Sequence, residues 1–140
     1  MKVSQLIKNK NVVTISGSKT VADLVSLLNE NKIGAVVVSN NGSDIVGIVS
    51  ERDIVKKLNQ TNDICGLKVS DLMTSDVQRC TKDDTVAEVM QKMTNGKFRH
   101  IPVVDENNKL ESIISIGDVV KAHITEIDDE RNALSSYIQN

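Results

Sequence analysis

The sequence repeats itself, and this repetition constrains the fold more than any other feature of the 140 residues. When the chain is shifted by 65 positions, residues 20–56 align with residues 85–121 without a gap, and ten of the 37 aligned pairs are identical. A shift of 66 positions aligns residues 3–6 with residues 69–72. A chain that carries one unit twice is expected to fold as two similar units that cover each other's apolar surface.

Each copy predicts the same order of elements, β-α-β-β-α. Apolar residues at i, i+3, i+4 and i+7 predict an amphipathic helix after Thr20 and another after Thr85, with each threonine as the capping residue. A second helix is predicted to start at Ser50 and at Ser115. The expected strands lie at residues 12–15, 35–38 and 45–49 in the first copy and at residues 77–80, 101–104 and 110–114 in the second.

These elements indicate an α/β (α+β) fold of two β-α-β-β-α repeats, packed sheet to sheet with pseudo-twofold symmetry. One copy of about 60 residues is marginal alone, so we expect one compact unit. We place repeat 1 at residues 1–62, repeat 2 at residues 63–125 and a C-terminal helical tail at residues 126–140. Apolar residues continue at roughly helical spacing into this tail, which is expected to pack on its own module or on a second chain.

Composition excludes several functions. The only aromatic residues are Phe98 and Tyr137, too few for a platform that stacks single-stranded nucleic acid. A net charge of −2 without a basic half disfavours DNA or RNA as a partner. No apolar run approaches the ~18 residues of a membrane span. The start of the chain is unlike a secretory signal, and Cys65 and Cys80 lack metal-site spacing, so we expect free thiols, a cytoplasmic protein and no metal.

Catalytic motifs are not recognisable in the sequence. Neither of the two histidines stands in a nucleophile motif with cysteine or serine, and the glycines form no phosphate-binding loop. We therefore expect no enzyme and assign no catalytic residue.

The spacing Ser-x-x-Asp occurs at the end of the last strand of each copy, as Ser50 with Asp53 and as Ser115 with Asp118. Such a pair caps a helix for purely structural reasons. A helix N-terminus after a strand also favours a polar or anionic ligand, and a carboxylate there can accept both hydroxyls of a ribose. From the residues alone, the cap is the better supported interpretation.

A basic group lies at the start of one strand of the second copy, where Lys97, Arg99 and His100 stand close together. These side chains can hold phosphates, or they can form a solvated loop edge, and the sequence leaves both interpretations open. Beside a phosphate, His100 would gain positive charge and strengthen binding at mildly acid pH.

The repeated unit resembles the cystathionine β-synthase (CBS) domain, and the tandem is similar to a CBS pair, or Bateman module, of the small stand-alone bacterial type. Residues 47–55, 98–105 and 115–121 carry the resemblance. It implies a non-catalytic regulatory protein for signal transduction or energy sensing, a flat homodimer and an unidentified regulated partner. The implied ligands contain adenosine: AMP, ADP or ATP, with NAD and S-adenosylmethionine as further members, bound in two clefts between the repeats as regulatory ligands rather than catalytic cofactors.

The resemblance also assigns roles to single residues. The aspartates take ribose hydroxyls and the serines lie near phosphate, basic side chains bind phosphates, and apolar side chains sandwich the adenine. The aspartates are Asp53 and Asp118, and the serines are Ser50 and Ser115. The basic side chains are Arg52, Lys97, Arg99 and His100. The apolar side chains are Val36, Val37, Val77, Ile101 and Pro102. Phe98 begins the same strand and is expected to touch either the base or the core. The alternative is a dimerisation or protein-interaction module whose clefts are vestigial.

Two departures from the family pattern make the copies unequal. Gly34 and Ala35 replace Arg99 and His100 in the first copy, and Ser112 stands where the motif of the second copy commonly carries glycine. The cleft of the second copy is therefore expected to bind phosphate better.

Overall fold

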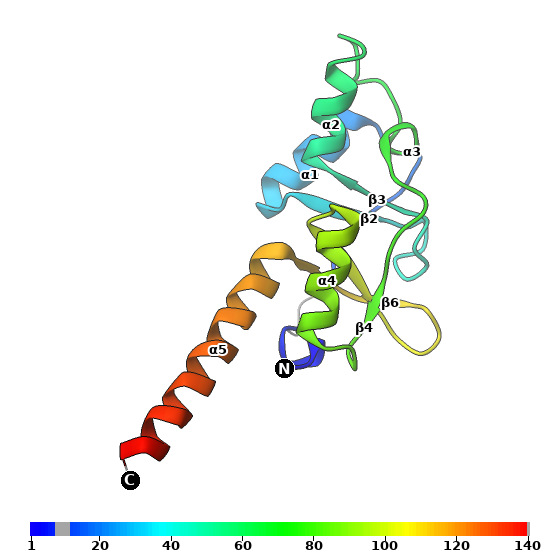
Figure 1. Ribbon diagram of the computed structural model, residues 1–140. Helices are drawn as coiled ribbons and strands as arrows, with labels where there is room; N and C mark the ends of the chain where they lie inside the picture. Colours follow the sequence, from blue (N-terminus) through cyan, green and yellow to red (C-terminus); the bar gives the residue numbers. More distant parts are fainter. Residues whose placement is uncertain (8–11, 140) are drawn as a thin grey trace. The chain divides into compact units, whose positions relative to one another are not determined.

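The computed structural model describes residues 1–7 and 12–139 (Figure 1). The first repeat contributes η1 (Val3–Gln5), β1 (Thr14–Ile15), α1 (Val21–Asn31), β2 (Ala35–Val38), β3 (Gly47–Ser50) and α2 (Glu51–Leu58). The second contributes α3 (Val69–Leu72), β4 (Cys80–Thr81), α4 (Val86–Gly96), β5 (His100–Val104), β6 (Leu110–Ser115) and α5 (Ile116–Gln139). The predicted mixed α/β class and the repeated β-α-β-β-α order are confirmed.

The strands form two three-stranded sheets, ordered β1-β2-β3 and β4-β5-β6. Strand β1 pairs in parallel with β2, and β4 pairs in parallel with β5 in the same way. Strands β2 and β3 are antiparallel, with Ala35 opposite Ser50. This register places the end of β3, where α2 begins, beside the start of β2.

The described chain divides into two compact units that do not coincide with the two repeats in the sequence. Unit 1 contains residues 1–7, 79–104 and 112–139, and unit 2 contains residues 12–78 and 105–111. The short helical turn η1 of the first repeat therefore lies in unit 1 with α4, and α3 of the second repeat lies in unit 2 with α1. The turn at residues 105–111 of the second repeat also belongs to unit 2.

Backbone hydrogen bonds explain this exchange. In unit 1, the Val3 N–H donates to the Asp84 carbonyl at 2.9 Å and the Val86 N–H donates to the Met1 carbonyl at 2.9 Å. In unit 2, equivalent bonds join Val69 to Lys19 and Val21 to Leu67, both at 2.8 Å. Because buried backbone groups must be paired, each short turn is fixed in front of the helix that it meets.

The turn at residues 105–111 is attached to unit 2 by two contacts. The Leu110 N–H donates to the Ser43 carbonyl at 2.8 Å, and the Lys109 ammonium pairs with the Asp44 carboxylate. This lysine holds the pKa of Asp44 below its usual value, mainly through the direct hydrogen bond.

Each unit has an aliphatic core, as the low aromatic content predicts. The core of unit 2 consists of Ile15, Val21, Leu24, Leu28, Val36, Val38, Val49, Ile64, Val69 and Leu72. The core of unit 1 consists of Val3, Cys80, Val86, Val89, Met93, Ile101, Val103, Ile114, Val119 and Ala122. Most residues of one core stand at the same positions of the repeat as residues of the other core. Val25, which the helical spacing places on the apolar face of α1, is instead 47% exposed.

The starts and ends of the first helix of each repeat follow local rules. Thr20 Oγ1 accepts a hydrogen bond from the Asp23 N–H at 3.2 Å, and Asp23 Oδ2 accepts one from the Thr20 N–H at 3.2 Å. This second bond is the main reason that the pKa of Asp23 lies below its usual value. The helices end at Lys32 and Lys97, whose φ angles of 54° and 57° are left-handed.

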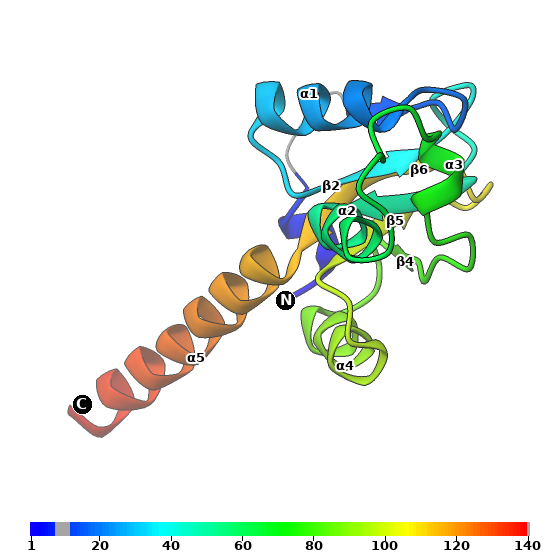
Figure 2. The same cartoon turned by 90° about the horizontal axis from the view of Figure 1, so that it is seen from above.

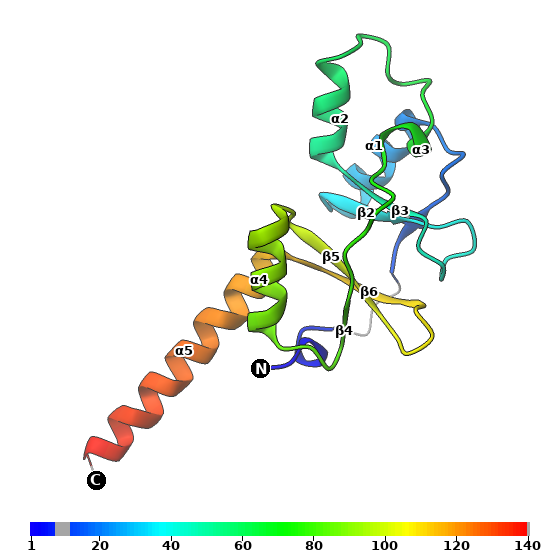
Figure 3. The same cartoon turned by 45° about the vertical axis from the view of Figure 1, so that its right-hand side comes forward.

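Helix α5 is much longer than its counterpart α2. Its first turns lie beside α4 in unit 1 (Figure 3). Its C-terminal half extends away from α4 and from the strands of that unit (Figure 2). No helix in the described ranges is both long enough and apolar enough to span a membrane.

Replacing Thr20 with alanine removes the hydroxyl that accepts from the first turn of α1. We expect the Thr20→Ala variant to lose about 1 kcal/mol in free energy of unfolding, measured by urea denaturation. Ser26→Ala on the same helix is the matched control, because it removes an exposed hydroxyl without a capping bond. An equal loss in the two variants would contradict the capping role of Thr20.

Candidate functional site

The Ser-x-x-Asp pair of unit 1 lies at the junction of β6 and α5. The Ser115 N–H donates to Asp118 Oδ2 at 3.0 Å, and the Asp118 N–H donates to Ser115 Oγ at 3.2 Å. The capping interpretation is thereby confirmed. Within residues 1–7 and 12–139, Asp118 Oδ1 accepts no hydrogen bond, and the side chain is exposed. The cap therefore uses one carboxylate oxygen and leaves the other for a ligand.

The basic group of the second repeat is held against this junction by the backbone. The N–H of Ile116, the first residue of α5, donates to the Arg99 carbonyl at 2.7 Å. Arg99 directly precedes His100, the first residue of β5, so both lie next to the start of α5. Arg99 and Lys97 are exposed and His100 is half-buried. Unit 1 thus joins a carboxylate, a helix N-terminus and a group of basic residues.

The equivalent junction of unit 2 joins β3 to α2. The Ser50 N–H and the Ser50 hydroxyl both donate to Asp53 Oδ2, at 2.8 Å and 3.1 Å. The Glu51 N–H donates to the Gly34 carbonyl at 2.9 Å, as Ile116 does in unit 1. Gly34 supplies no cation here. The candidates that remain are the exposed Lys32, which is the counterpart of Lys97, and the exposed Arg52 on α2.

The apolar candidates divide between the two faces of their strands. Val36 and Ile101 point into the cores and are 1% and 0% exposed. Val37 and Pro102, their neighbours, lie on the opposite faces of β2 and β5, since strand residues alternate, and they are buried as well. Val77, assigned with the second copy from the sequence, is half-buried in unit 2.

Phe98 packs against the core of unit 1. Its ring lies over Gly96, where a Cβ would overlap the ring atoms. The structure therefore answers the question about this residue in favour of the core. In the parts of the chain that the structure describes, no three His, Cys, Asp or Glu side chains form a group that could hold a metal ion.

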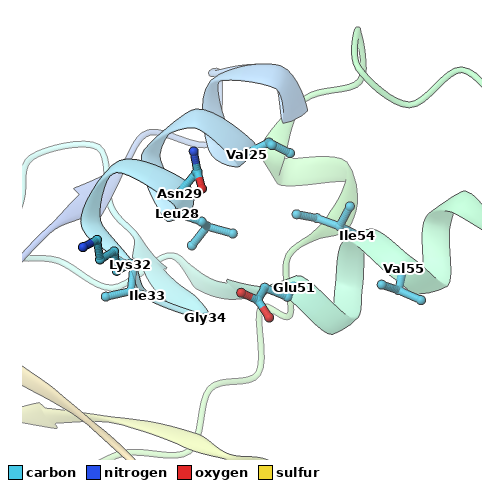
Figure 4. Close-up of a pocket in the computed structure, with 9 residues that line it drawn as sticks. All are labelled: Val25, Leu28, Asn29, Lys32, Ile33, Gly34, Glu51, Ile54 and Val55. Atoms are coloured by element: carbon cyan, nitrogen blue, oxygen red, sulfur yellow. The ribbon is translucent and has the colours of Figure 1, made fainter.

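An open hollow of about 460 Å³ lies between α1 and α2 in unit 2 (Figure 4). It is lined by Val25, Leu28, Asn29, Lys32, Ile33, Gly34, Glu51, Ile54 and Val55. Its walls are mainly apolar, and Val25 and Val55 are 47% and 65% exposed. None of the residues predicted to bind ligand lines it. The sequence signal that could have indicated this surface is the apolar pair Ile54 and Val55 beside the helical face of α1.

Comparison with known proteins decides the family. The family model of the CBS domain matches residues 3–60 and again residues 69–124. The chain belongs to the CBS domain family. The crystal structure of the CBS-domain containing protein ATU1752 from Agrobacterium tumefaciens has a TM-score of 0.83 and 40% sequence identity, over 88% of this chain and 99% of that chain.

Two further proteins are similar to this chain, one by structure and one by sequence. The CBS domain protein PAE2072 from Pyrobaculum aerophilum, solved in complex with AMP, has a TM-score of 0.76 and 28% identity, over 84% of this chain and 89% of that chain. The mitochondrial CBS domain-containing protein CBSX3 from Arabidopsis thaliana is 36% identical over 125 residues, which cover 86% of this chain and 60% of CBSX3. The family match ends at residue 124, whereas α5 continues to Gln139.

Close contacts explain why a glycine stands at position 47, in β3. A Cβ on Gly47 would lie 2.8 Å from the Thr74 carbonyl oxygen and 2.7 Å from the Met73 sulfur. We expect Gly47→Ala to lower the free energy of unfolding by about 1–3 kcal/mol, because the neighbouring backbone must move. Ser112→Ala, at the equivalent place in β6, is the control and should change stability far less in the same chemical denaturation. Comparable losses would refute the close approach at Gly47.

Proposed function

We propose that the protein is a non-catalytic regulatory module that binds an adenosine-containing ligand, with AMP, ADP or ATP as the first candidates and S-adenosylmethionine and NAD as further ones. The observation that carries the proposal is the junction of β6 and α5. There, one oxygen of Asp118 caps the helix, the other accepts no hydrogen bond from any described residue, and Arg99 is bonded to the same turn. The AMP complex of PAE2072 supports the choice of ligand class.

The chemistry of the junction suits a ribose phosphate. Vicinal ribose hydroxyls donate hydrogen bonds, and Asp118 Oδ1 is an ionised acceptor on the exposed side of the helix. Phosphate oxygens accept hydrogen bonds, and the N-terminus of α5 together with Ser115, Lys97, Arg99 and His100 offers donors and positive charge. The ribose hydroxyls of the ligand would therefore meet a hydrogen-bond acceptor, and its phosphate would meet hydrogen-bond donors and positive charge.

The adenine ring needs apolar contacts of another kind. Val36 and Ile101 are committed to the cores, so we assign them a supporting role beneath the strands. The proposed contacts for the base are Val37 and Pro102, which are buried on the other faces of β2 and β5, and the half-buried Val77, each for the junction of its own unit. Aliphatic side chains can flank a flat ring by dispersion without aromatic stacking.

The two junctions are proposed to differ in strength. Both present an aspartate and a serine at a helix start, but Arg99 has Gly34 as its counterpart in unit 2. Lys32 and Arg52 supply the remaining positive charge there. The junction of unit 1 is therefore proposed as the better phosphate site. We further propose a homodimer in the cytoplasm that passes the ligand signal to a regulated protein.

A second candidate function is a dimerisation or protein-interaction module whose ligand sites are vestigial. The hollow between α1 and α2 favours it, because its apolar side chains are open to solvent. Calorimetry with AMP separates the two candidates. Binding at micromolar to low millimolar concentration supports the regulatory module, and an absence of heat with every adenosine ligand at millimolar concentration leaves the interaction module.

The conservative substitution Asp118→Asn tests the carboxylate. Its amide oxygen can still accept from the Ser115 N–H, but the second acceptor oxygen is replaced by a donor. We expect AMP to bind about 10–100-fold more weakly, since a charge-assisted hydrogen bond contributes about 1.5–3 kcal/mol. The matched Asp53→Asn variant should lose less total binding. Titration calorimetry and ligand-induced thermal stabilisation measure both.

Unchanged binding in Asp118→Asn, with intact stability, would refute the ribose role of Asp118. A larger loss in Asp53→Asn would refute the proposed order of the two junctions.

The two left-handed lysines provide a matched pair for the phosphate role. Glycine adopts a positive φ without the steric cost that lysine bears, so Lys97→Gly and Lys32→Gly should each raise the free energy of unfolding by up to about 1 kcal/mol. Lys97→Gly should weaken AMP binding more than Lys32→Gly, because Lys97 stands beside Arg99 and His100, whereas Lys32, its counterpart in unit 2, stands beside Gly34 and Ala35. Unchanged affinity in Lys97→Gly would exclude the Lys97 ammonium from phosphate binding.

A further inference from the structure

The outer face of α5 carries an apolar stripe that no described part of the chain covers. Its members are exposed by 41% to 74% of their surface, and Figure 1 shows that the C-terminal half of the helix has no neighbour in unit 1. The stripe consists of Val120, Ile124, Ile127, Leu134 and Ile138. An uncovered apolar row of this length indicates an interaction surface.

The spacing of the stripe identifies the kind of partner. Its members, together with Arg131, recur alternately four and three residues apart, which is the 3.5-residue period of a coiled-coil seam. A single polar residue at such a position fixes the register at a cost in stability. The period therefore indicates another helix as the partner, rather than a sheet or a small molecule.

An adjacent face of α5 is already occupied by its own unit. Val119 and Ala122 lie in the core of unit 1, and Glu126 is half-buried and pairs with the Met1 ammonium at 2.7 Å. From residue 127 to residue 138 every side chain is exposed. A segment of this length is marginal as an isolated helix in water, so packing against a partner would stabilise it.

The order of charges along α5 indicates the identity and direction of that partner. Beside the stripe, Lys121 and His123 come first, and Asp128 and Glu130 follow seven residues later, about two turns along the helix. Two parallel copies would place only His123 against Asp128 of the other copy and would leave Lys121 and Glu130 without a charged partner. Two antiparallel copies would place Lys121 against Asp128 and His123 against Glu130 of the other copy, twice over. The helix is thus complementary to itself in the antiparallel direction.

Space along the stripe permits this direction. An antiparallel pair centred between Ile124 and Ile127 would place Leu134 of one copy over Gly117 of the other. Gly117 is exposed, and the atom nearest to an added Cβ there is its own neighbour Ser115 Oγ at 3.6 Å. A large apolar side chain can therefore approach the helix backbone at this point.

We propose that α5 pairs antiparallel with α5 of a second copy of this chain, with the centre of the contact between Ile124 and Ile127. Much of this surface lies beyond residue 124, where the family match ends. The contact is thus a property of this chain's own extension, and it does not depend on the proposed ligand binding.

Site-directed cross-linking tests the direction. In a Cys65→Ser background the one remaining native thiol is Cys80, which is buried and whose pKa burial raises to about 11, so it reacts slowly. Full-length Lys121→Cys and Asp128→Cys chains are mixed, allowed to exchange and treated with a short bismaleimide. We expect the mixed 121–128 product to exceed both same-site products. Asn132→Cys, on α5 but off the stripe, measures random collision.

Predominant same-site products would overturn the antiparallel direction, and cross-linking no greater than that of Asn132→Cys would overturn the pairing itself. Sedimentation velocity provides an independent measurement: Ile127→Glu should weaken self-association at least tenfold, whereas Asn132→Glu, with the same added charge off the stripe, should not. Identical sedimentation of the two variants and the unaltered protein would also overturn the proposal. AMP binding measured on the same samples reports on the proposed function separately.

Discussion

The structure depends on the reciprocal exchange of two short turns. Val3 is bonded in front of α4 and Val69 in front of α1 by matching pairs of backbone hydrogen bonds, and both valine side chains are completely buried. Each core is therefore completed by a segment from the other repeat. Because buried backbone groups must be paired, the exchange joins the two repeats through their backbones as well as their apolar surfaces.

The strand-to-helix junctions show how one local motif serves structure and ligand binding together. A carboxylate has two oxygens, and the cap uses only Oδ2 in Asp53 and in Asp118. The cap fixes the side chain, so the remaining oxygen is held in place before any ligand arrives. Such fixed acceptors lose little conformational entropy on binding, which is the physical advantage of placing a binding residue in a capping box.

Much of the fold followed from local rules in the sequence. The duplication, the threonine caps and the helix starts after Ser50 and Ser115 were predicted because capping and apolar spacing depend on residues three or four positions apart. The packing of Phe98 and the exposure of Val25 could not be predicted in this way. Each depends on how far a neighbouring element approaches, which no local pattern encodes.

The sequence by itself determined the repeated element order, the aliphatic cores and the two Ser-x-x-Asp pairs. Only the tertiary structure decided which segments form a unit and which groups meet at each junction. The bond from Ile116 to Arg99 brings a basic residue to the start of α5, and its counterpart in unit 2 brings a glycine. The physical reason is that these partners are 17 residues apart in both repeats, so their contact arises from the pairing of strands and not from helical or strand periodicity.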